Sequence, residues 1–115
     1  MSGIDPEKTY KAKPFVDANI SEIQKDGKFR VVGKISEITD TSIVIDDGFE
    51  QISIILPEDV NINLKVGLQI RALGYVEMLP EKQMRGSFIQ NFNNVDLEVY
   101  RQINELEQSL RRANT

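Results

Sequence analysis

Five stretches between residues 28 and 92 alternate apolar and polar residues with the period of two that is typical of half-buried β-strands. In the first stretch, KFRVVGKISEI, Phe29, Val31 and Ile35 share one face before the pattern changes phase to reach Ile38. Gly33 lies inside this stretch, where a glycine commonly marks a bulge or a sharp bend. The pattern therefore predicts a long first strand that curves. The other predicted strands are SIVID, QISIIL, LQIRALGYVEM and the shorter SFIQNF.

A tight hairpin is predicted between the second and third of these strands. The segment DDGFE at 46–50 contains the Asp-Gly pair that favours such a turn. Asp46 and Asp47 form a pair of adjacent carboxylates of interest for acid–base chemistry, but turn chemistry explains aspartates that precede Gly48. We therefore assign both residues to the turn. The segment LPEKQMRG at 79–86 is predicted to be a loop.

The N-terminal region lacks this alternation. Residues 1–14 mix charged residues with glycine and proline, which predicts a flexible N-terminal arm. Residues 15–24 have apolar positions at Phe15, Val16, Ile20 and Ile23, and they predict one short helical turn with Asp17 as its N-cap.

A narrow apolar stripe runs along the C-terminal segment, residues 94–112. Val99, Ile103, Leu106 and Leu110 recur at spacings of four, three and four, the a/d pattern of a coiled-coil seam. A helix that rests on a globular core usually has a wider apolar face. The stripe therefore predicts a helix that packs against partner helices, whereas the alternative is a helix that plugs the end of its own barrel.

The start of this helix carries its own signals. Asn93 or Asn94 is the expected N-cap, with Asp96 in the first turn, where a negative charge suits the helix dipole. Leu97 and Tyr100 widen the apolar stripe only near its start. We therefore expect the first turn to dock on the barrel while the rest of the helix projects.

The predicted fold is mainly β: a five-stranded Greek-key barrel with a C-terminal α-helix. Such a strand order, with a bent, glycine-bearing first strand, is compatible with the oligonucleotide/oligosaccharide-binding (OB) fold, although an SH3-like barrel has a similar pattern. The predicted organisation is an arm at 1–14, the barrel at 15–93 and an oligomerisation helix at 94–112. A chain of 115 residues is the size of one domain.

Composition excludes several classes of function. The chain has no cysteine and no histidine, so it lacks thiolate chemistry, disulfides and the commonest general base and metal ligand. No phosphate loop or nucleophile elbow is present. We expect no enzyme activity, no catalytic residue, no metal site, no cofactor and no small-molecule substrate. The polar start and the lack of a long apolar run predict an intracellular protein with no membrane contact.

The net charge of −4 weighs against strong independent binding of nucleic acid, because neutralised phosphates supply most of that affinity. A binding face would need aromatic side chains interleaved with basic ones. The candidates for this role are Arg71, Tyr75, Lys82, Arg85 and Phe88, which Arg30 and Lys34 could extend. The competing interpretation is that Phe88 belongs to the core, Tyr75 covers a barrel seam and the charges are solvated.

Two segments of the chain resemble a known family. VVGKISEI followed by IVIDDG is similar to the first hairpin of the smallest OB subunit of heterotrimeric replication protein A, a single-stranded DNA-binding complex of eukaryotes and many archaea. VDLEVYRQI resembles the pattern that opens the C-terminal helix of that family, with matches at Asp96, Leu97 and Tyr100. The resemblance covers residues 15–112. It does not extend to individual DNA contacts.

The resemblance implies a role in assembly. In that family the C-terminal helices of three subunits form a parallel three-helix bundle, and the small subunit mainly holds the trimer together. The implied partners are the middle and large OB subunits, with single-stranded DNA bound mainly by the complex in replication, repair and recombination. The implied location is the nucleus in a eukaryote or the chromosome in an archaeal cytoplasm. The residues expected to bind the partner helices are Val99, Tyr100, Ile103, Leu106 and Leu110.

Two other functions remain open at this point. The chain could be the small subunit of a telomere-capping complex, which is built on the same plan. It could also be a self-sufficient module that binds single-stranded nucleic acid through the candidates near Arg71 and Phe88. Binding of the isolated chain to a single-stranded oligonucleotide separates these roles, because the self-sufficient module requires affinity with a steep salt dependence.

Overall fold

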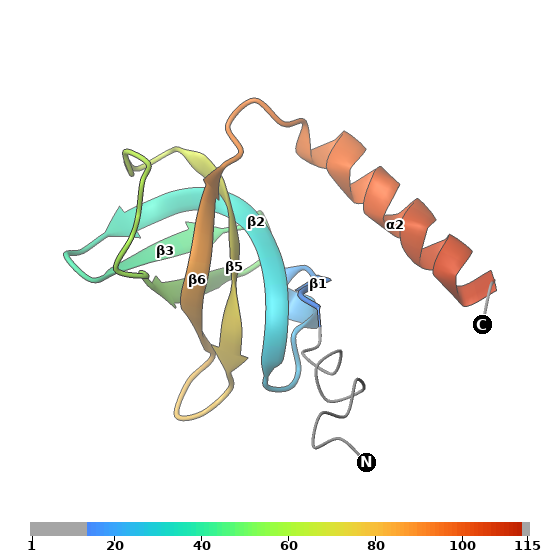
Figure 1. Cartoon of the computed structure of the whole chain (residues 1–115), viewed down its shortest axis with the longest axis horizontal. Coiled ribbons are helices and arrows are strands. Elements are labelled where there is room, and N and C mark those ends of the chain that lie inside the picture. Colours follow the sequence, from blue (N-terminus) through green and yellow to red (C-terminus); the bar gives the residue numbers. More distant parts are fainter. Residues whose placement is uncertain (1–13, 114–115) are drawn as a thin grey trace, which may run out of the picture.

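A computed structural model of the chain describes residues 14–113, and it contains a closed five-stranded barrel followed by one α-helix (Figure 1). The predicted N-terminal arm therefore lies almost entirely outside the described residues. Figure 1 shows the helix leaving one end of the barrel and running past its side. The barrel strands are β2 (Gly27–Ile38), β3 (Ser42–Asp46), β4 (Gln51–Ile55), β5 (Gln69–Glu77) and β6 (Gln83–Asn91), and the helix is α2 (Leu97–Ala113).

The long strand β2 closes the barrel because it is shared between two neighbours. Its first part pairs antiparallel with β5, and its last part pairs antiparallel with β3. The register shifts between Ile35 and Glu37, which confirms the predicted change of phase and bends the strand. Gly33 lies where β2 passes from pairing with β5 to pairing with β3, and a Cβ there would be 2.7 Å from the Asp46 carbonyl oxygen. A glycine is thus required at this point, because a side chain would collide with the backbone of β3.

The connectivity is that of an OB fold. β3 and β4 form the predicted hairpin, β4 pairs parallel with β6, and β6 pairs antiparallel with β5. The pairing of β2 with β5 completes the ring, so the predicted Greek-key barrel is confirmed. β6 begins at Gln83 and is longer than the sequence pattern predicted, since residues 83–86 pair with β5 and do not belong to a loop.

The core is almost wholly aliphatic. The inward positions of β5 alternate as the sequence predicted, and Ile70, Ala72 and Val76 are fully buried. Ile38 is an exception, because it lies beyond the bulge and remains 39% exposed. The buried core residues are Ile20, Ile23, Val31, Ile35, Ile43, Ile45, Ile52, Ile54, Leu68, Ile70, Ala72, Val76, Met84 and Ile89.

The segment before β2 differs from the prediction of a single helical turn capped by Asp17. Val16 and Asp17 form a short strand, β1, that pairs parallel with Phe29 and Arg30 of β2. A 3₁₀ helix, η1 (Ile20–Glu22), follows. Backbone pairing with β2 overrides the local helical preference of Val16 and Asp17, a contact that local sequence does not encode.

Asp47 holds η1 against the barrel. Its Oδ2 accepts a hydrogen bond from the Ile20 amide at 2.9 Å, and its Oδ1 accepts from the amides of Phe49 and Glu50, each at 2.9 Å. Asp47 is buried, and this arrangement confirms its assignment to the turn. The carboxylate thus joins the β3–β4 hairpin to the segment that places Ile20 in the core.

Among residues 14–113, no helix is both long and apolar enough to cross a membrane.

Candidate partner-binding helix and nucleic-acid interface

The helix α2 begins at a different cap from the predicted one. Asp96 Oδ1 accepts hydrogen bonds from the amides of Glu98 at 2.9 Å and Val99 at 3.3 Å. Asp96 is therefore the N-cap, and the prediction of Asn93 or Asn94 is wrong. Asn93 instead accepts a hydrogen bond from the Gln69 amide through its Oδ1, at 3.3 Å, which ties the connection to the start of β5.

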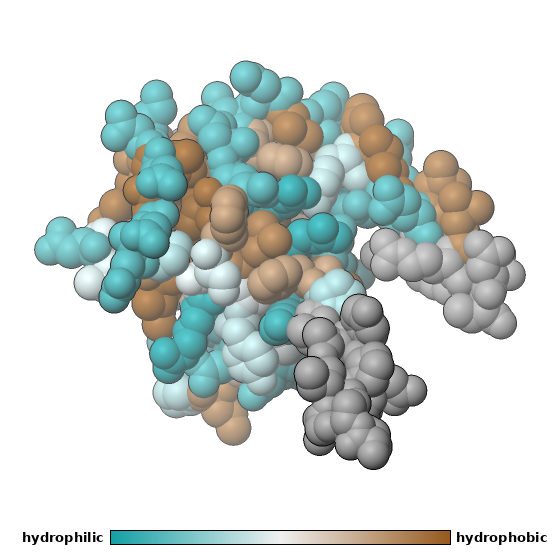
Figure 2. All heavy atoms as spheres, viewed as in Figure 1, coloured by the Kyte–Doolittle hydropathy of each residue, from teal (hydrophilic) through white to brown (hydrophobic). Residues whose placement is uncertain are grey.

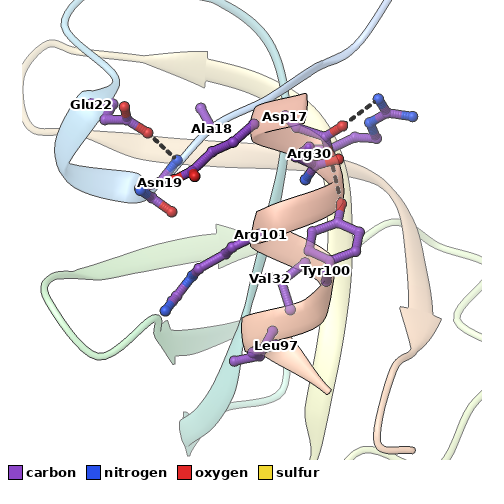
Figure 3. Close-up of a pocket in the computed structure, with 11 residues that line it drawn as sticks. Asp17, Ala18, Asn19, Glu22, Arg30, Val32, Leu97, Tyr100 and Arg101 are labelled. Carbon is purple, nitrogen blue, oxygen red and sulfur yellow. Dashed lines mark hydrogen bonds and ion pairs between the residues drawn. The ribbon is translucent and has the colours of Figure 1, made fainter. Parts of the chain in front are cut away.

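Tyr100 joins the helix to the barrel. Its hydroxyl donates a hydrogen bond to Asp17 Oδ1 at 2.6 Å, as Figure 3 shows, and Asp17 Oδ2 pairs with Arg30 at 2.6 Å. The Tyr100 ring meets Phe92 edge-on, with 5.1 Å between ring centroids, and the Arg71 guanidinium lies 5.0 Å from the Phe92 centroid. The first turns of α2 therefore dock on the barrel, as expected.

The electrostatic setting of Tyr100 follows from this docking. Burial raises the pKa of the Tyr100 hydroxyl, and the hydrogen bond to Asp17 raises it further. Hydrogen bonds with Asn104 and Arg71 act in the opposite direction on this pKa. The hydroxyl is thus held in its protonated form, in which it can donate to the carboxylate.

Arg101 makes the second contact between the helix and the barrel. It donates a hydrogen bond to the Asp47 carbonyl oxygen at 2.9 Å, and its guanidinium lies 5.5 Å from the centroid of the Phe49 ring. In Figure 3 its side chain extends from α2 toward the β3–β4 hairpin. A cleft of about 110 Å³ remains between the helix and the barrel, and its lining includes Asn104 and Glu105 of α2. The side of the helix that faces the barrel is therefore largely polar.

The apolar seam lies on the opposite side of the helix. Successive helical residues are turned by about 100°, which places the four seam residues roughly opposite Asn104 and Leu97 of the cleft lining. The exposed fractions are 49% for Val99, 51% for Ile103, 61% for Leu106 and 56% for Leu110. Figure 2 shows hydrophobic residues at the surface along α2. The seam is unpartnered, and it does not plug the barrel.

Tyr100 docks on the barrel of its own chain, and its predicted contact with partner helices stays a prediction. It was expected to bind partner helices with the seam, but it is half-buried against Asp17 and Phe92 of its own chain. In the helical repeat it lies on the barrel side of Ile103, at the edge of the seam, and about 120° from Leu106. The seam as the structure defines it consists of Val99, Ile103, Leu106 and Leu110.

The structure divides the predicted nucleic-acid residues into two groups. Arg71 and Lys82 are engaged within the protein. Arg71 donates to Gln90 Oε1 at 2.7 Å, whereas Lys82 donates to the Ile20 carbonyl at 2.7 Å and pairs with Glu50 at 2.8 Å. Lys82 therefore helps to hold η1 and the β3–β4 hairpin together, a structural role that its position in the sequence does not reveal.

Tyr75, Arg85 and Phe88 form the second group and share one outer surface of the barrel. Tyr75 is 44% exposed and Phe88 is 59% exposed, so the interpretation of Phe88 as a core residue is wrong. The β5–β6 register places Tyr75 beside Arg85 and Phe88 beside Leu73. Glu77 bonds to Arg85 at 2.6 Å, and this hydrogen bond and opposite charge raise the pKa of the Arg85 guanidinium.

Sequence reasoning missed two of the residues that place the helix. Asp17 was interpreted as a helix cap, but it accepts from both Tyr100 and Arg30. Arg101 carried no recognisable signal, because its partners are a backbone carbonyl and the exposed ring of Phe49. The sequence pointed to the junction between helix and barrel only through Tyr100, which matches the pattern that opens the C-terminal helix of the resembled family.

Metal ligands are also absent from the described part of the chain: residues 14–113 contain no cluster of three carboxylate, histidine or cysteine side chains that could hold a metal ion.

No protein-family model matches this chain, and no curated protein matches its sequence. Comparison by structure nevertheless finds solved proteins with the same fold. The S. pombe Stn1–Ten1 complex contains a chain that superposes with a TM-score of 0.69 at 14% identity, over 85% of this chain and 95% of that one. The S. pombe telomere capping protein Ten1 gives 0.65 at 13% identity, over 76% and 88%.

The structure of U. maydis replication protein A bound to single-stranded DNA contains a similar chain as well. The TM-score is 0.69 at 17% identity, over 88% of this chain and 95% of that one. At these identities the comparisons establish the OB fold with its C-terminal helix. The resemblance to the small OB subunit of replication protein A is thus confirmed at the level of the fold.

Proposed function

We propose that this chain is an assembly subunit of a replication protein A-like single-stranded DNA-binding heterotrimer, which it joins through α2. The observation that carries the proposal is the orientation of the helix. Its polar side faces the chain's own barrel, and its seam of Val99, Ile103, Leu106 and Leu110 is half-exposed on the other side.

The energetics of the seam favour partner helices. Complete burial of a fully exposed aliphatic side chain of this size stabilises by roughly 1.5–3 kcal/mol. The four seam residues are about half-exposed, so each can contribute roughly half of that on association. A helix that plugged its own barrel would bury them, and here they remain exposed. The a/d spacing of the seam suits knobs-into-holes packing against the middle and large OB subunits in a three-helix bundle.

The structural neighbours of this chain support an assembly role. One neighbour belongs to a two-protein complex and another to replication protein A bound to single-stranded DNA. A telomere-capping complex is equally compatible with this fold, since Ten1 is also a structural neighbour. The identity of the captured partners decides between these two complexes. The proposal includes no catalytic activity and places the protein inside the cell, in the nucleus of a eukaryote or with the chromosome of an archaeon.

A double substitution in the seam tests the proposal. Ile103→Glu with Leu106→Glu places unpaired charges where partner helices would pack, so the tagged chain should lose its partners in a pull-down from the native source. The wild-type chain should retain two larger OB-containing proteins, identified by mass spectrometry. A version that ends at Asn93 should retain neither. Thermal unfolding followed by circular dichroism should show that the barrel of the double variant remains folded.

The matched control introduces the same two charges beside the seam. Gln102→Glu with Ser109→Glu changes two exposed residues of α2 that lie off the apolar stripe, and this variant should still retain both partners. Equal capture by the seam variant and the wild type would contradict the assembly role. Melting of the barrel in the seam variant would show that the helix stabilises its own chain instead.

A further inference from the structure

Two outer faces of the barrel differ in charge. OB folds commonly bind oligonucleotides over their second and third strands, which are β3 and β4 here. The outward residues of these strands are Ser42, Val44, Asp46, Gln51, Ser53 and Ile55, with neither lysine nor arginine among them. The adjoining loops add Asp40, Glu81 and Lys82, and Lys82 is already engaged by Glu50 and the Ile20 carbonyl. A nucleic-acid backbone would therefore meet carboxylates on the surface that this fold usually offers.

The face formed by β2, β5 and β6 has the opposite character. The strand registers align its outward residues in two rows that cross all three strands. One row is Lys28, Tyr75 and Arg85, and the next is Arg30, Leu73 and Phe88. Each row thus combines at least one cation with an exposed aromatic ring, and Tyr75 and Phe88 lie on adjacent strands one row apart. We refer to these six residues as the cationic face.

The ion pairs on this face leave donors available. Arg30 uses one terminal nitrogen for Asp17, and Arg85 uses Nε for Glu77. A guanidinium carries five N–H donors, so the largely exposed Arg85 can also contact a phosphate, whereas Arg30 is more covered and its Nε is buried. The ammonium of Lys28 lies 5.7 Å from the centroid of the Phe15 ring.

We propose that the cationic face binds single-stranded nucleic acid, with bases stacked on Tyr75 and Phe88 and phosphates held by Lys28 and Arg85. Alternating cations and open aromatic rings suit a strand whose bases and phosphates are both exposed. Charge complementarity favours this polyanion, because the cations gather on this face of a chain whose net charge is −4. The strand would run over the barrel surface opposite to the one that OB folds normally use.

The cationic face and the seam are separate. The docked start of α2 borders this face, because Arg30 and Val32 of β2 both line the cleft, and Arg71 in the next row packs on Phe92. The seam itself is on the far side of the helix. The biological use of this site rests on the proposed function, in which the chain joins a complex that binds DNA, but its binding can be measured on this chain alone.

The test is fluorescence anisotropy of the full chain with a labelled oligothymidylate longer than the roughly 4–16 nucleotides that one OB fold occupies. Low salt should reveal binding, which should weaken as salt increases. The variant Tyr75→Ala with Phe88→Ala should bind at least about tenfold more weakly, because two stacking contacts are lost. The variant Lys28→Glu with Arg85→Glu should also weaken binding and reduce the salt slope by about 1.4, or about 0.7 for each phosphate contact.

Two control variants match these changes elsewhere. Phe49→Ala removes an exposed aromatic ring from the β3–β4 turn, and Lys65→Glu reverses an exposed charge in the β4–β5 connection. Both should bind as the wild type does. Equal losses in controls and face variants, or no wild-type binding at low salt, would overturn the proposal.

Partner capture separates this proposal from the assembly role. Variants of the cationic face should retain both partner proteins in the pull-down, whereas the seam variant should lose them and still bind the oligonucleotide. If the face variants lose the partners, the face belongs to a protein interface and the nucleic-acid site is refuted. Loss of oligonucleotide binding alone would leave the assembly role intact.

Discussion

At the scale of single residues, one carboxylate links parts of the chain that are far apart in sequence. Asp47 accepts hydrogen bonds from the amide of Ile20 and from two amides of its own turn, and its backbone carbonyl accepts from Arg101. The hairpin turn, η1 and α2 therefore all meet at this residue. The side chain of adjacent Asp46 instead makes local hydrogen bonds, with the Gly48 amide and with Gln51.

This difference predicts unequal costs for two neighbouring substitutions. Asp47→Ala leaves the buried Ile20 amide without its acceptor and should lower the free energy of unfolding by about 2–3 kcal/mol. Asp46→Ala removes an exposed turn contact and should cost roughly 0.5–1 kcal/mol. Urea unfolding of both variants measures these changes, and equal costs would refute the special role of Asp47.

At the scale of elements, alternation of apolar residues was sufficient to predict the five barrel strands, because one face of each strand is buried in a single core. It was insufficient for Val16 and Asp17, whose strand exists only through pairing with β2. The cap at Asp96 was missed for a related reason: several polar residues near the helix start could act as caps, and the fold selects one. The local sequence pattern thus specifies whether a segment forms a strand or a helix better than it specifies which residues of the chain that segment contacts.

The candidate site was predictable to a similar extent. The a/d spacing identified the seam, including Ile103 and Leu106, because a helical repeat is a local property. It could not show that Tyr100 binds Asp17, or that Lys82 is engaged by the Ile20 carbonyl, since those contacts join residues distant in sequence. The rows of the cationic face depend on strand register, which the sequence pattern alone did not provide.

The contact between β5 and β6 predicts a strict requirement for glycine at position 74. A Cβ there would lie 2.2 Å from the Arg85 carbonyl oxygen and 2.7 Å from Met84 Cγ, and the backbone oxygen cannot move without disrupting the strand pairing. Gly74→Ala should therefore destabilise the barrel by about 1–3 kcal/mol. Gly86→Ala, where the nearest atom is 3.0 Å away, should cost less. Thermal unfolding compares the two, and a greater loss for Gly86→Ala would contradict this account.

At the scale of the whole molecule, the barrel and the helix are joined mainly by polar contacts at Tyr100 and Arg101. Tyr100→Phe removes the donor to Asp17 and should weaken helix docking by about 1 kcal/mol, a severalfold loss of the docked state. Hydrogen exchange of the α2 amides at neutral pH should be faster in this variant. Unchanged exchange would show that the hydrogen bond does not hold the helix.

The same contact predicts a dependence on alkaline pH. The pKa of Tyr100 is raised in the folded chain above its ordinary value of 10.0, so the protonated hydroxyl stabilises the docked helix. This stabilisation is complete below pH 10.0 and is lost as the pH rises through the raised pKa. The difference in tyrosinate absorbance between the wild type and Tyr100→Phe, followed against pH, should give a midpoint above that of free tyrosine. A midpoint at or below the free value would contradict it.

The division of α2 into a polar inner side and an apolar outer side has a consequence for how such subunits diverge. Residues such as Ile103 and Leu106 are half-exposed and lie away from the barrel, so substitutions there leave the barrel's own contacts unchanged. The seam, and with it the choice of partner, can therefore change while the barrel stays the same. The barrel can equally change while the seam stays the same. Transplanting a seam from a related subunit onto this helix should redirect the chain to that subunit's complex without a redesign of its fold.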